Sequence, residues 1–415
     1  MTELLTLTEE QRRNVFNQVG FLAGLSPKVV EKDWWVTLTL KAIFQTQYAP
    51  HILFKGGTSL SKCWNLISRF SEDIDLAIDR EYLGFGGDLS VKKIHNLKKA
   101  ACEFTTNVLK TALEEQILAL GVPEGMVTIT AKPVLPTFPD MDPQELRLAY
   151  PSLYEPIEYI ADLVKIEVSG RSLKEPWATC TIQSFVTEYL PGQDYSGEPF
   201  EVFAVEPKRT FLEKLFLLHE EFLKLDDIRH LRMSRHLYDV VKLMDTIHGW
   251  NAILDLELYE FVIAHRTKYH KLPGINYKTH AVATINFIPP ESIRKEYQSD
   301  YQVMRERMIH EENAPSFEQL ITQLQELLNR IQSPIDFGGR TLQEIIEDAQ
   351  QNDPKDSSSP NFMIEGSAIT IPVTYITDPV KPVSQKNENA RYEVIFLRKN
   401  KELVFRKIKK NNLDK

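Results

Sequence analysis

The spacing of apolar residues changes near the middle of the chain, and this change predicts two kinds of domain. Before about residue 207, apolar and polar residues alternate or form short apolar runs, which is typical of strands. The predicted strands lie at residues 51–55, 73–78, 126–132, 159–169, 178–190 and 201–205. After residue 207, apolar residues recur every three or four positions, which indicates amphipathic helices. The predicted helices lie at residues 211–225, 228–247, 253–267, 291–311 and 317–331.

Helical patterns also accompany the strands of the first half. Residues 8–47 predict two helices, because Gly24 and Pro27 interrupt one continuous pattern. A shorter helix is predicted at 58–67, and 92–120 predict one long helix. Helices and strands of this first half therefore predict an α+β fold, with a mixed sheet and flanking helices.

The chain divides into three predicted parts. They are an α/β domain, a helical domain and a small β-containing appendix, at residues 1–206, 207–333 and 334–415. Within the appendix, residues 352–360 are rich in Pro, Ser and Asp, which is typical of a linker. Two β-prone segments, 392–398 and 402–408, flank Lys399, Asn400 and Lys401 and predict a hairpin.

Composition limits the classes of protein that remain. The chain has 415 residues, 42% of them hydrophobic, so it can bury cores in two or three domains. We expect no membrane span and no signal peptide, because no long apolar run is present. Three cysteines with wide spacing indicate a reducing cytoplasm rather than a disulfide framework. A net charge of −9 argues against a protein that coats nucleic acid non-specifically, although a local basic groove is compatible with it.

The segment FKGGTSLSKCWNLISRFSEDIDLAID, residues 54–79, carries the candidate chemistry. Gly56 and Gly57 follow a predicted strand and let the backbone approach a ligand without a Cβ atom in the way. A predicted helix begins with Thr58 and Ser59, whose hydroxyls can cap it and contact phosphates. This order of elements predicts a site for an anion such as a triphosphate.

Two carboxylates follow on the next predicted strand. Ser71, Asp73 and Asp75 share one face of that strand, because residues two apart point the same way. Two neighbouring carboxylates favour a bound Mg²⁺ or Mn²⁺, which can activate an attacking oxygen and hold the leaving pyrophosphate. A Gly-Gly turn or a pair of acids is common by itself, and an edge strand often presents acids to water. Their order here is specific for a nucleotidyltransferase, and neither GxxxxGK[ST] nor GxGxxG is present.

These motifs resemble the AbiEii/AbiGii toxin family, a branch of the polymerase-β-like nucleotidyltransferases. The resemblance rests on KGGTSL, RFSEDIDL, the upstream EKDWW, VKIEVSGRSLKEP, EPKRTFLEKLFLLH and SRHLYDVVKL, and it spans roughly residues 27–250. It implies a nucleotidyltransferase-type sheet with a following helical domain, and says nothing about residues 334–415.

The resemblance also implies roles for three later residues. Glu167 matches a third metal-binding carboxylate, although a strand acid can simply be solvated. Lys214 matches a lysine that binds the triphosphate, although a lysine on an apolar helix can extend to water instead. Asp239 matches a catalytic or lysine-orienting aspartate, although a surface pair with Arg235 is the plain alternative.

Several further residues are weaker candidates for binding phosphate. They are Lys55, Arg69, Ser71, Arg171 and Arg209. Arg171 can equally pair with Glu175, and Ser71 can be a structural hydroxyl or the acceptor of a transferred group. Trp34, Trp35 and Trp64 are expected in the core rather than stacked on bases. The histidines lack the spacing of a zinc site.

The expected activity is transfer of a nucleoside monophosphate (NMP) from an NTP to an acceptor. The resemblance implies the toxin of a toxin–antitoxin or phage-defence system, RNA such as tRNA as the acceptor, and an antitoxin encoded by a neighbouring gene. Three alternatives stay open: a protein or small-molecule acceptor, transfer of a terminal phosphoryl group, and a nucleotide-binding sensor without turnover.

Overall fold

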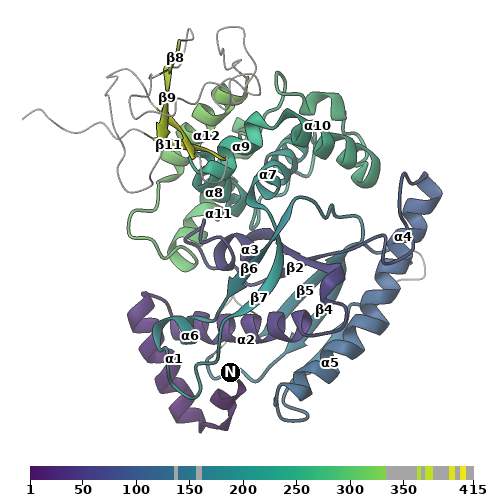
Figure 1. Cartoon of the computed structure of the whole chain (residues 1–415), viewed down its shortest axis with the longest axis vertical. Coiled ribbons are helices and arrows are strands. Elements are labelled where there is room, and N and C mark those ends of the chain that lie inside the picture. The colour runs from purple at the N-terminus through teal and green to yellow at the C-terminus, as the bar shows by residue number, and fades with distance from the viewer. Residues whose placement is uncertain are drawn as a thin grey trace, which may run out of the picture. The chain divides into compact units, whose positions relative to one another are not determined.

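A computed structural model describes residues 1–134, 139–155 and 161–332, together with the backbone of four strands beyond them (Figure 1). The predicted linker at 352–360 and the predicted loop at 399–401 lie outside the described residues. The chain forms two compact units. The first contains Met1–Thr210, Ala264–Leu272 and Ser299–Ala314, and the second contains Phe211–Ile263, Pro273–Gln298 and Pro315–Lys415.

Two segments from the predicted helical domain, Ala264–Leu272 and Ser299–Ala314, belong instead to the first unit. In one, the buried ring of Tyr269 joins Leu89 and Leu97 in a small apolar cluster. In the other, the backbone oxygen of Met308 accepts a hydrogen bond of 2.7 Å from the Phe70 amide. Such pairings between distant parts of the chain cannot be inferred from the periodicity of either segment.

The first unit contains a seven-stranded mixed sheet with the strand order β3-β4-β5-β2-β1-β7-β6. Its strands are β1 (Ile52–Lys55), β2 (Ile74–Ile78), β3 (Thr128–Ala131), β4 (Gln144–Ala149), β5 (Leu163–Ser169), β6 (Trp177–Ile182) and β7 (Phe200–Val205). Strand β2 is antiparallel to β1 and parallel to β5, and β5 is antiparallel to β4. The mixed sheet confirms the predicted fold class, whereas β4 was not predicted.

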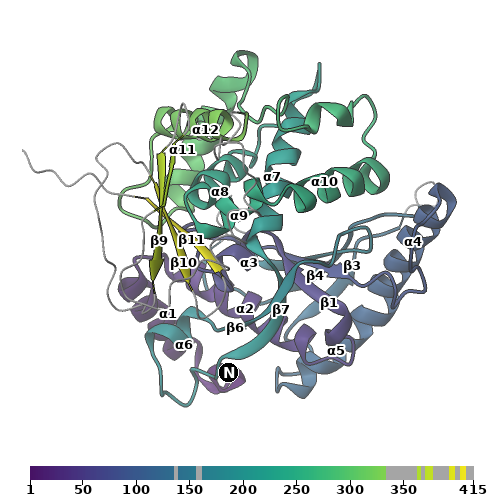
Figure 2. The same ribbon diagram turned by 45° about the horizontal axis from the view of Figure 1, so that its top comes forward.

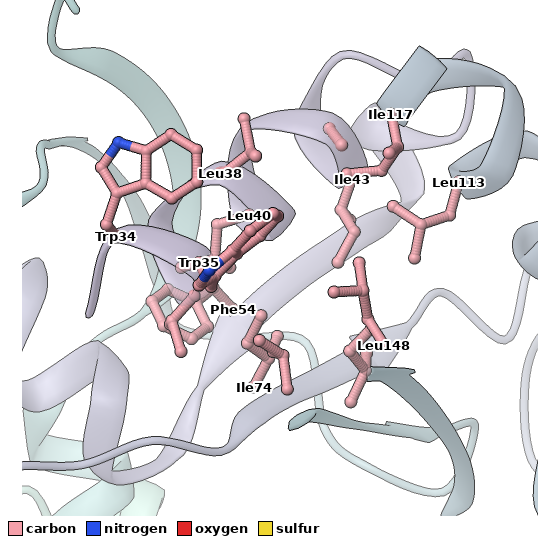
Figure 3. Close-up of a cluster of buried hydrophobic side chains, with 14 of the residues drawn as sticks. Trp34, Trp35, Leu38, Leu40, Ile43, Phe54, Ile74, Leu113, Ile117 and Leu148 are labelled. Atoms are coloured by element: carbon pink, nitrogen blue, oxygen red, sulfur yellow. The ribbon is translucent and has the colours of Figure 1, made fainter. Parts of the chain in front are cut away.

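Helix α2 (Pro27–Phe44) packs against one face of this sheet (Figure 2). It follows α1 (Glu9–Ala23), and the predicted break between them is present: Gly24 is left-handed with φ +66°, and Ser26 caps α2. Figure 3 shows Trp34 and Trp35 of α2 among the buried side chains of the core. Trp64 packs at the margin of the same core.

The remaining helices of the first unit modify three predictions. The long helix at 92–120 is continuous, but α4 (Val91–Glu103) and α5 (Lys110–Ala119) are joined by a π-helical turn, η3 (Phe104–Leu109) (Figure 1). Helix α3 is short, Gly56–Lys62. The predicted strand at 178–190 is wrong in its second half, where Ser184 caps a short helix, α6 (Phe185–Tyr189). Short helical turns of this unit also occur at η1 (Thr2–Thr6), η2 (Ala49–His51) and η4 (Arg266–His270), whereas η6 (Glu291–Ile293) belongs to the second unit.

The later part of the chain is helical, as predicted. Its helices are α7 (Pro207–Phe222), α8 (Ser234–Met244), α9 (Ile247–Leu254), α10 (Leu256–His265), η5 (Tyr277–His280), α11 (Arg294–Arg307) and α12 (Phe317–Gln332). Helix α8 begins later than predicted, because Asp227 and Arg232 have positive φ angles that a helix does not accept. None of the helices in the described residues is long and apolar enough to cross a bilayer.

Four further strands form a separate sheet in the order β11-β10-β9-β8. They are β8 (Phe362–Glu365), β9 (Thr370–Ile376), β10 (Tyr392–Leu397) and β11 (Glu402–Lys407). The antiparallel pairing of β10 with β11 confirms the predicted hairpin, and β9 pairs with β10 in parallel.

Candidate active site

Charged side chains lie in a row across four neighbouring strands of the first unit. Asp75 on β2 is directly opposite Lys55 on β1 and Glu167 on β5, and Glu167 is directly opposite Glu145 on β4. Residues directly opposite one another project from the same face of a sheet. The row Lys55–Asp75–Glu167–Glu145 therefore occupies one face. The intervening Ile74 and Ile166 have no exposed surface and pack on the face that the helices cover.

A second row lies two residues away on the same face. Lys165 on β5 is directly opposite Arg147 on β4, and Asp73 precedes β2. Lys165 Nζ is 2.7 Å from Glu167 Oε1, and Arg147 Nε is 2.5 Å from Glu145 Oε1. Burial acts to lower the pKa of Lys165, but its hydrogen bond to Glu167 and the charge of Asp73 raise it overall.

The two rows, which we call the charged face, bring together the predicted acids and three residues that sequence reasoning missed. Glu145, Arg147 and Lys165 were not singled out, although Lys165 lies within the motif VKIEVS. Alternating polarity in QELRLA could have indicated the strand, but not which strand lies beside it.

The acids of the charged face suit a hard divalent cation in their chemistry. Carboxylate oxygens are the ligands that Mg²⁺ and Mn²⁺ prefer, and Asp73, Asp75 and Glu167 are all partly accessible. As they stand, no group of three or more His, Cys, Asp and Glu side chains within the described residues is arranged to hold a metal ion. In this arrangement the Glu167 carboxylate contacts Lys165 instead.

The Gly-Gly turn lies directly against the acids. Gly56 has φ +80°, and a Cβ atom at this position would be 2.1 Å from Asp75 Oδ2. A Cβ atom on Gly57 would be 2.7 Å from Arg69 Nη2 and 2.9 Å from Ser71 Oγ. Close approach and a positive φ angle therefore both favour glycine at position 56, whereas a Cβ atom at position 57 would have to displace the ends of the Arg69 and Ser71 side chains. The turn, the guanidinium of Arg69 and the carboxylate of Asp75 lie together.

The hydroxyl of Thr58 joins α3 to the strand of the acids. Thr58 Oγ1 donates to the backbone oxygen of Asp73 at 2.5 Å and lies 2.9 Å from Ser71 Oγ. The prediction that Thr58 and Ser59 cap α3 is wrong, because the helix begins at Gly56 and both residues are buried inside it. The Thr58 hydroxyl supports the site from within the helix.

Helix α2 carries buried charges that hold the surroundings of the acids. Lys32 Nζ donates to the backbone oxygens of Ala161, at 2.9 Å, and Leu163, and lies 3.4 Å from Glu72 Oε2. Glu72 directly precedes Asp73, and Leu163 begins β5. Burial lowers the pKa of Lys32, and the charge of Glu72 acts in the opposite direction. Lys32 thus connects the strand of Asp73 and Asp75 to the strand of Glu167.

Two neighbours of Lys32 act in the same way. Asp33 accepts a hydrogen bond of 2.8 Å from the Phe185 amide and lies 2.5 Å from Lys62 Nζ, at the end of α3. Glu31 accepts a hydrogen bond of 2.8 Å from the Leu153 amide, and burial raises its pKa. The motif EKDWW is therefore a set of buried contacts that fix α3 and the loops around the sheet.

The second unit contains the other predicted pair. Lys214 Nζ on α7 lies 2.9 Å from Asp239 Oδ2 on α8 and 3.4 Å from His236 Nδ1. The Asp239 side chain has no exposed surface and that of Lys214 is 8% exposed. Asp239 is thus placed to orient Lys214. Because Asp239 is buried, the plain alternative of a surface pair with Arg235 does not apply.

The arginines predicted to bind phosphate are used within the first unit. Arg171 Nε lies 3.3 Å from Asp142 Oδ1, so the alternative partner Glu175 is not the one it pairs with. Arg209 has no exposed surface and donates a hydrogen bond of 3.0 Å to the backbone oxygen of Glu175. Both arginines hold the loop that follows β5.

Acids on neighbouring strands beside a Gly-Gly turn, within a mixed sheet, define the class of nucleotidyltransferases. The model of a family within that class, described as nucleotidyl transferase AbiEii toxin of type IV toxin–antitoxin systems, matches residues 39–323, more than half of the chain. The chain belongs to this family.

Comparisons of sequence and structure add more distant similarities. No curated protein matches the chain significantly. Among solved structures, MenT4, a nucleotidyltransferase toxin from Mycobacterium tuberculosis H37Rv, is 17% identical with a TM-score of 0.35 over 77% of this chain and 99% of its own. A candidate nucleotidyltransferase from H. pylori is 14% identical with a TM-score of 0.34 over 74% and 96%.

Proposed function

We propose that this protein transfers NMP from an NTP to an acceptor hydroxyl, and that pyrophosphate leaves. The hydroxyl oxygen forms a bond to the α-phosphorus as the bond to the bridging oxygen of pyrophosphate breaks, and the hydroxyl proton is released. The observation that carries the proposal is the contact of Gly56 with Asp75, which brings a phosphate-binding turn and a carboxylate to one place.

Each group of residues has a task in this reaction. Asp73, Asp75 and Glu167 would hold Mg²⁺ or Mn²⁺, which when bound stabilises charge on the reacting phosphate and makes the hydroxyl more acidic. Backbone amides of the turn bind the triphosphate, with the side chains of Lys55, Arg69 and Ser71 beside them. Arg171 and Arg209 support this site through the loop they hold.

Lys214 supplies further positive charge to the triphosphate, and Asp239 holds its ammonium group in place. The buried ion pair supports this assignment, because Asp239 fixes the position of the Lys214 ammonium group.

As a member of this family, the protein acts as the toxin of a type IV toxin–antitoxin pair. We propose that it works in the cytoplasm, that its acceptor is RNA such as tRNA, and that a neighbouring gene encodes the antitoxin.

The test measures transfer of label to total tRNA and to lysate protein in the presence of Mg²⁺. Each NTP is supplied with a ³²P label at the α or the γ position, and wild type is compared with the Asp73→Asn/Asp75→Asn variant. We expect α-label in RNA with wild type and none with the variant or with a chelator. Transfer of γ-label would identify a phosphoryl transferase, and NTP binding without transfer of either label would overturn the proposal.

A further inference from the structure

We propose that Arg147 and Lys165 form a subsite that binds a phosphodiester of the acceptor. The acceptor is then a polynucleotide with a free hydroxyl next to that phosphodiester. This inference rests on the proposed function, and it narrows the acceptor to a chemical class that the charged face can recognise.

The order of residues along the charged face places the acceptor on the β4 side. The Gly-Gly turn follows β1, so the triphosphate lies at the β1 end of the row that contains Asp75. Glu167 and Glu145 continue that row in the opposite direction, onto β5 and β4. The attacking hydroxyl must approach the α-phosphate opposite the leaving pyrophosphate. It therefore comes from the side of β5 and β4, where Lys165 and Arg147 lie.

Arg147 has the accessibility that a binding residue needs. Its side chain is 48% exposed, and it contacts Glu145 through Nε. Among the described residues its two terminal nitrogens have no partner, so they can donate to an incoming anion. A guanidinium donates two parallel hydrogen bonds to a phosphate, which is a geometry that an ammonium group cannot supply.

Arg147 and Lys165 lie directly beside the acids of the charged face. Arg147 Nε is 2.5 Å from Glu145 Oε1 and Lys165 Nζ is 2.7 Å from Glu167 Oε1. An anion bound by these two cations therefore lies next to the acids. In a polynucleotide the last phosphodiester is the anion nearest the terminal hydroxyl, so binding it brings that hydroxyl to the acids.

The experiment uses the RNA species that wild type labels, rebuilt as a synthetic oligonucleotide with the same terminal hydroxyl. Initial rates of NMP transfer give the KM for the oligonucleotide and the KM for the NTP. The variants are Arg147→Ala and Arg147→Lys. Lys110→Ala is the control, because Lys110 is a surface lysine, 28% exposed and paired with Glu114, on α5, a helix of the opposite, apolar face.

We expect Arg147→Ala to raise the KM for the oligonucleotide about tenfold or more, the loss typical of one hydrogen bond to a charged group. The KM for the NTP should not change. Arg147→Lys should restore part of the loss, because it keeps the charge without the planar fork. Lys110→Ala should match wild type.

A second substrate locates the contact. In it, the last phosphodiester is replaced by an uncharged methylphosphonate. Wild type should bind this oligonucleotide at least as weakly as Arg147→Ala binds the natural one. Arg147→Ala should distinguish the two oligonucleotides less than wild type does, because only Lys165 remains in the subsite.

If Arg147→Ala leaves the KM unchanged, or distinguishes the two oligonucleotides as strongly as wild type does, the inference is overturned while nucleotidyl transfer stands. If wild type labels protein but no RNA, the acceptor class is overturned and the proposed reaction again stands. If wild type transfers no NMP to any acceptor, it is the proposed function that fails.

Discussion

Helix α2 and the charged face both place lysines beside acids, yet the two regions differ in their exposure to water. Lys62 Nζ lies 2.5 Å from Asp33 Oδ1, and the two side chains are 8% and 3% exposed. Lys165 Nζ lies 2.7 Å from Glu167 Oε1, and these side chains are 32% and 29% exposed. The distances are nearly equal, so distance does not distinguish a structural pair from a functional one.

The difference in exposure determines what each region can do. A buried charge that loses its partner keeps the full cost of desolvation, so the contacts around α2 must persist. A partly exposed pair contributes little to stability, because water replaces either partner. Lys165 can therefore release Glu167 to a cation or contact a phosphate, whereas Lys32 cannot leave Glu72. Catalysis and ligand binding are therefore expected where an ion pair can exchange one partner for a ligand at a low cost in free energy.

The largest expected effect is on activity, at the charged face. Asp75→Asn removes a negative oxygen and should lower kcat/KM for NMP transfer about a thousandfold. A metal clamp supplies several kcal/mol to the transition state, and each 1.4 kcal/mol or so is a factor of ten. Stability should change by less than about 1 kcal/mol, since a partly exposed charge is removed from a row of acids. Transfer of NMP is measured with the labelled NTP. If the variant is as active as wild type, Asp75 is not part of the catalytic site.

The converse effect is expected at α2. Lys32→Met removes the buried ammonium group that contacts Glu72 and the backbone oxygens of Ala161 and Leu163, and should lower the free energy of unfolding by about 3–5 kcal/mol. Lys165→Met is the matched control and should cost less than about 1 kcal/mol. Urea denaturation measures both. Equal losses in the two variants would show that the comparison between the regions is wrong.

These two regions also show how far the sequence could be read. Gly56, Gly57, Asp73 and Asp75 lie within one short stretch, where local spacing fixes which side chains share a turn or a strand face. The position of Glu145 depends on the pairing of β4 with β5, which no local pattern contains.

The charges of α2 were harder to interpret from the sequence. An apolar pattern predicts the helix, but burial of Lys32 depends on contacts with Ala161 and Leu163, far along the chain. The same reason explains why the capping role of Thr58 was predicted wrongly, since its partner is the backbone of Asp73. Local geometry could be predicted, and pairing between distant segments could not.

A smaller effect is expected at Gly56, next to the charged face, where a comparison with Gly84 separates the effect of steric contact from that of backbone strain. Gly56 and Gly84 have φ angles of +80° and +85°, but a Cβ atom on Gly84 would meet nothing within 4 Å. Either change to Ala should cost about 1–2 kcal/mol of stability from the left-handed conformation. Gly56→Ala should in addition displace Asp75 and lower kcat/KM about tenfold, whereas Gly84→Ala should keep wild-type activity. If both variants keep activity, the close approach of Gly56 to Asp75 is not needed for the reaction.

The smallest effect concerns a buried histidine of the second unit. His219 is 2% exposed, and burial lowers its pKa. The unfolded chain therefore binds protons first as the pH falls. The stability from the neutral ring is complete above the ordinary value of 6.5 and is lost below it, as the pH falls towards the lower folded pKa. The slope is at most about 1.4 kcal/mol per pH unit. Urea denaturation between pH 7 and pH 5, roughly the range in which histidine titrates, should show this loss. His219→Gln should flatten it, whereas His310→Gln should flatten it less, because His310 in the first unit is exposed to water. An unchanged slope in His219→Gln would assign the loss to other groups.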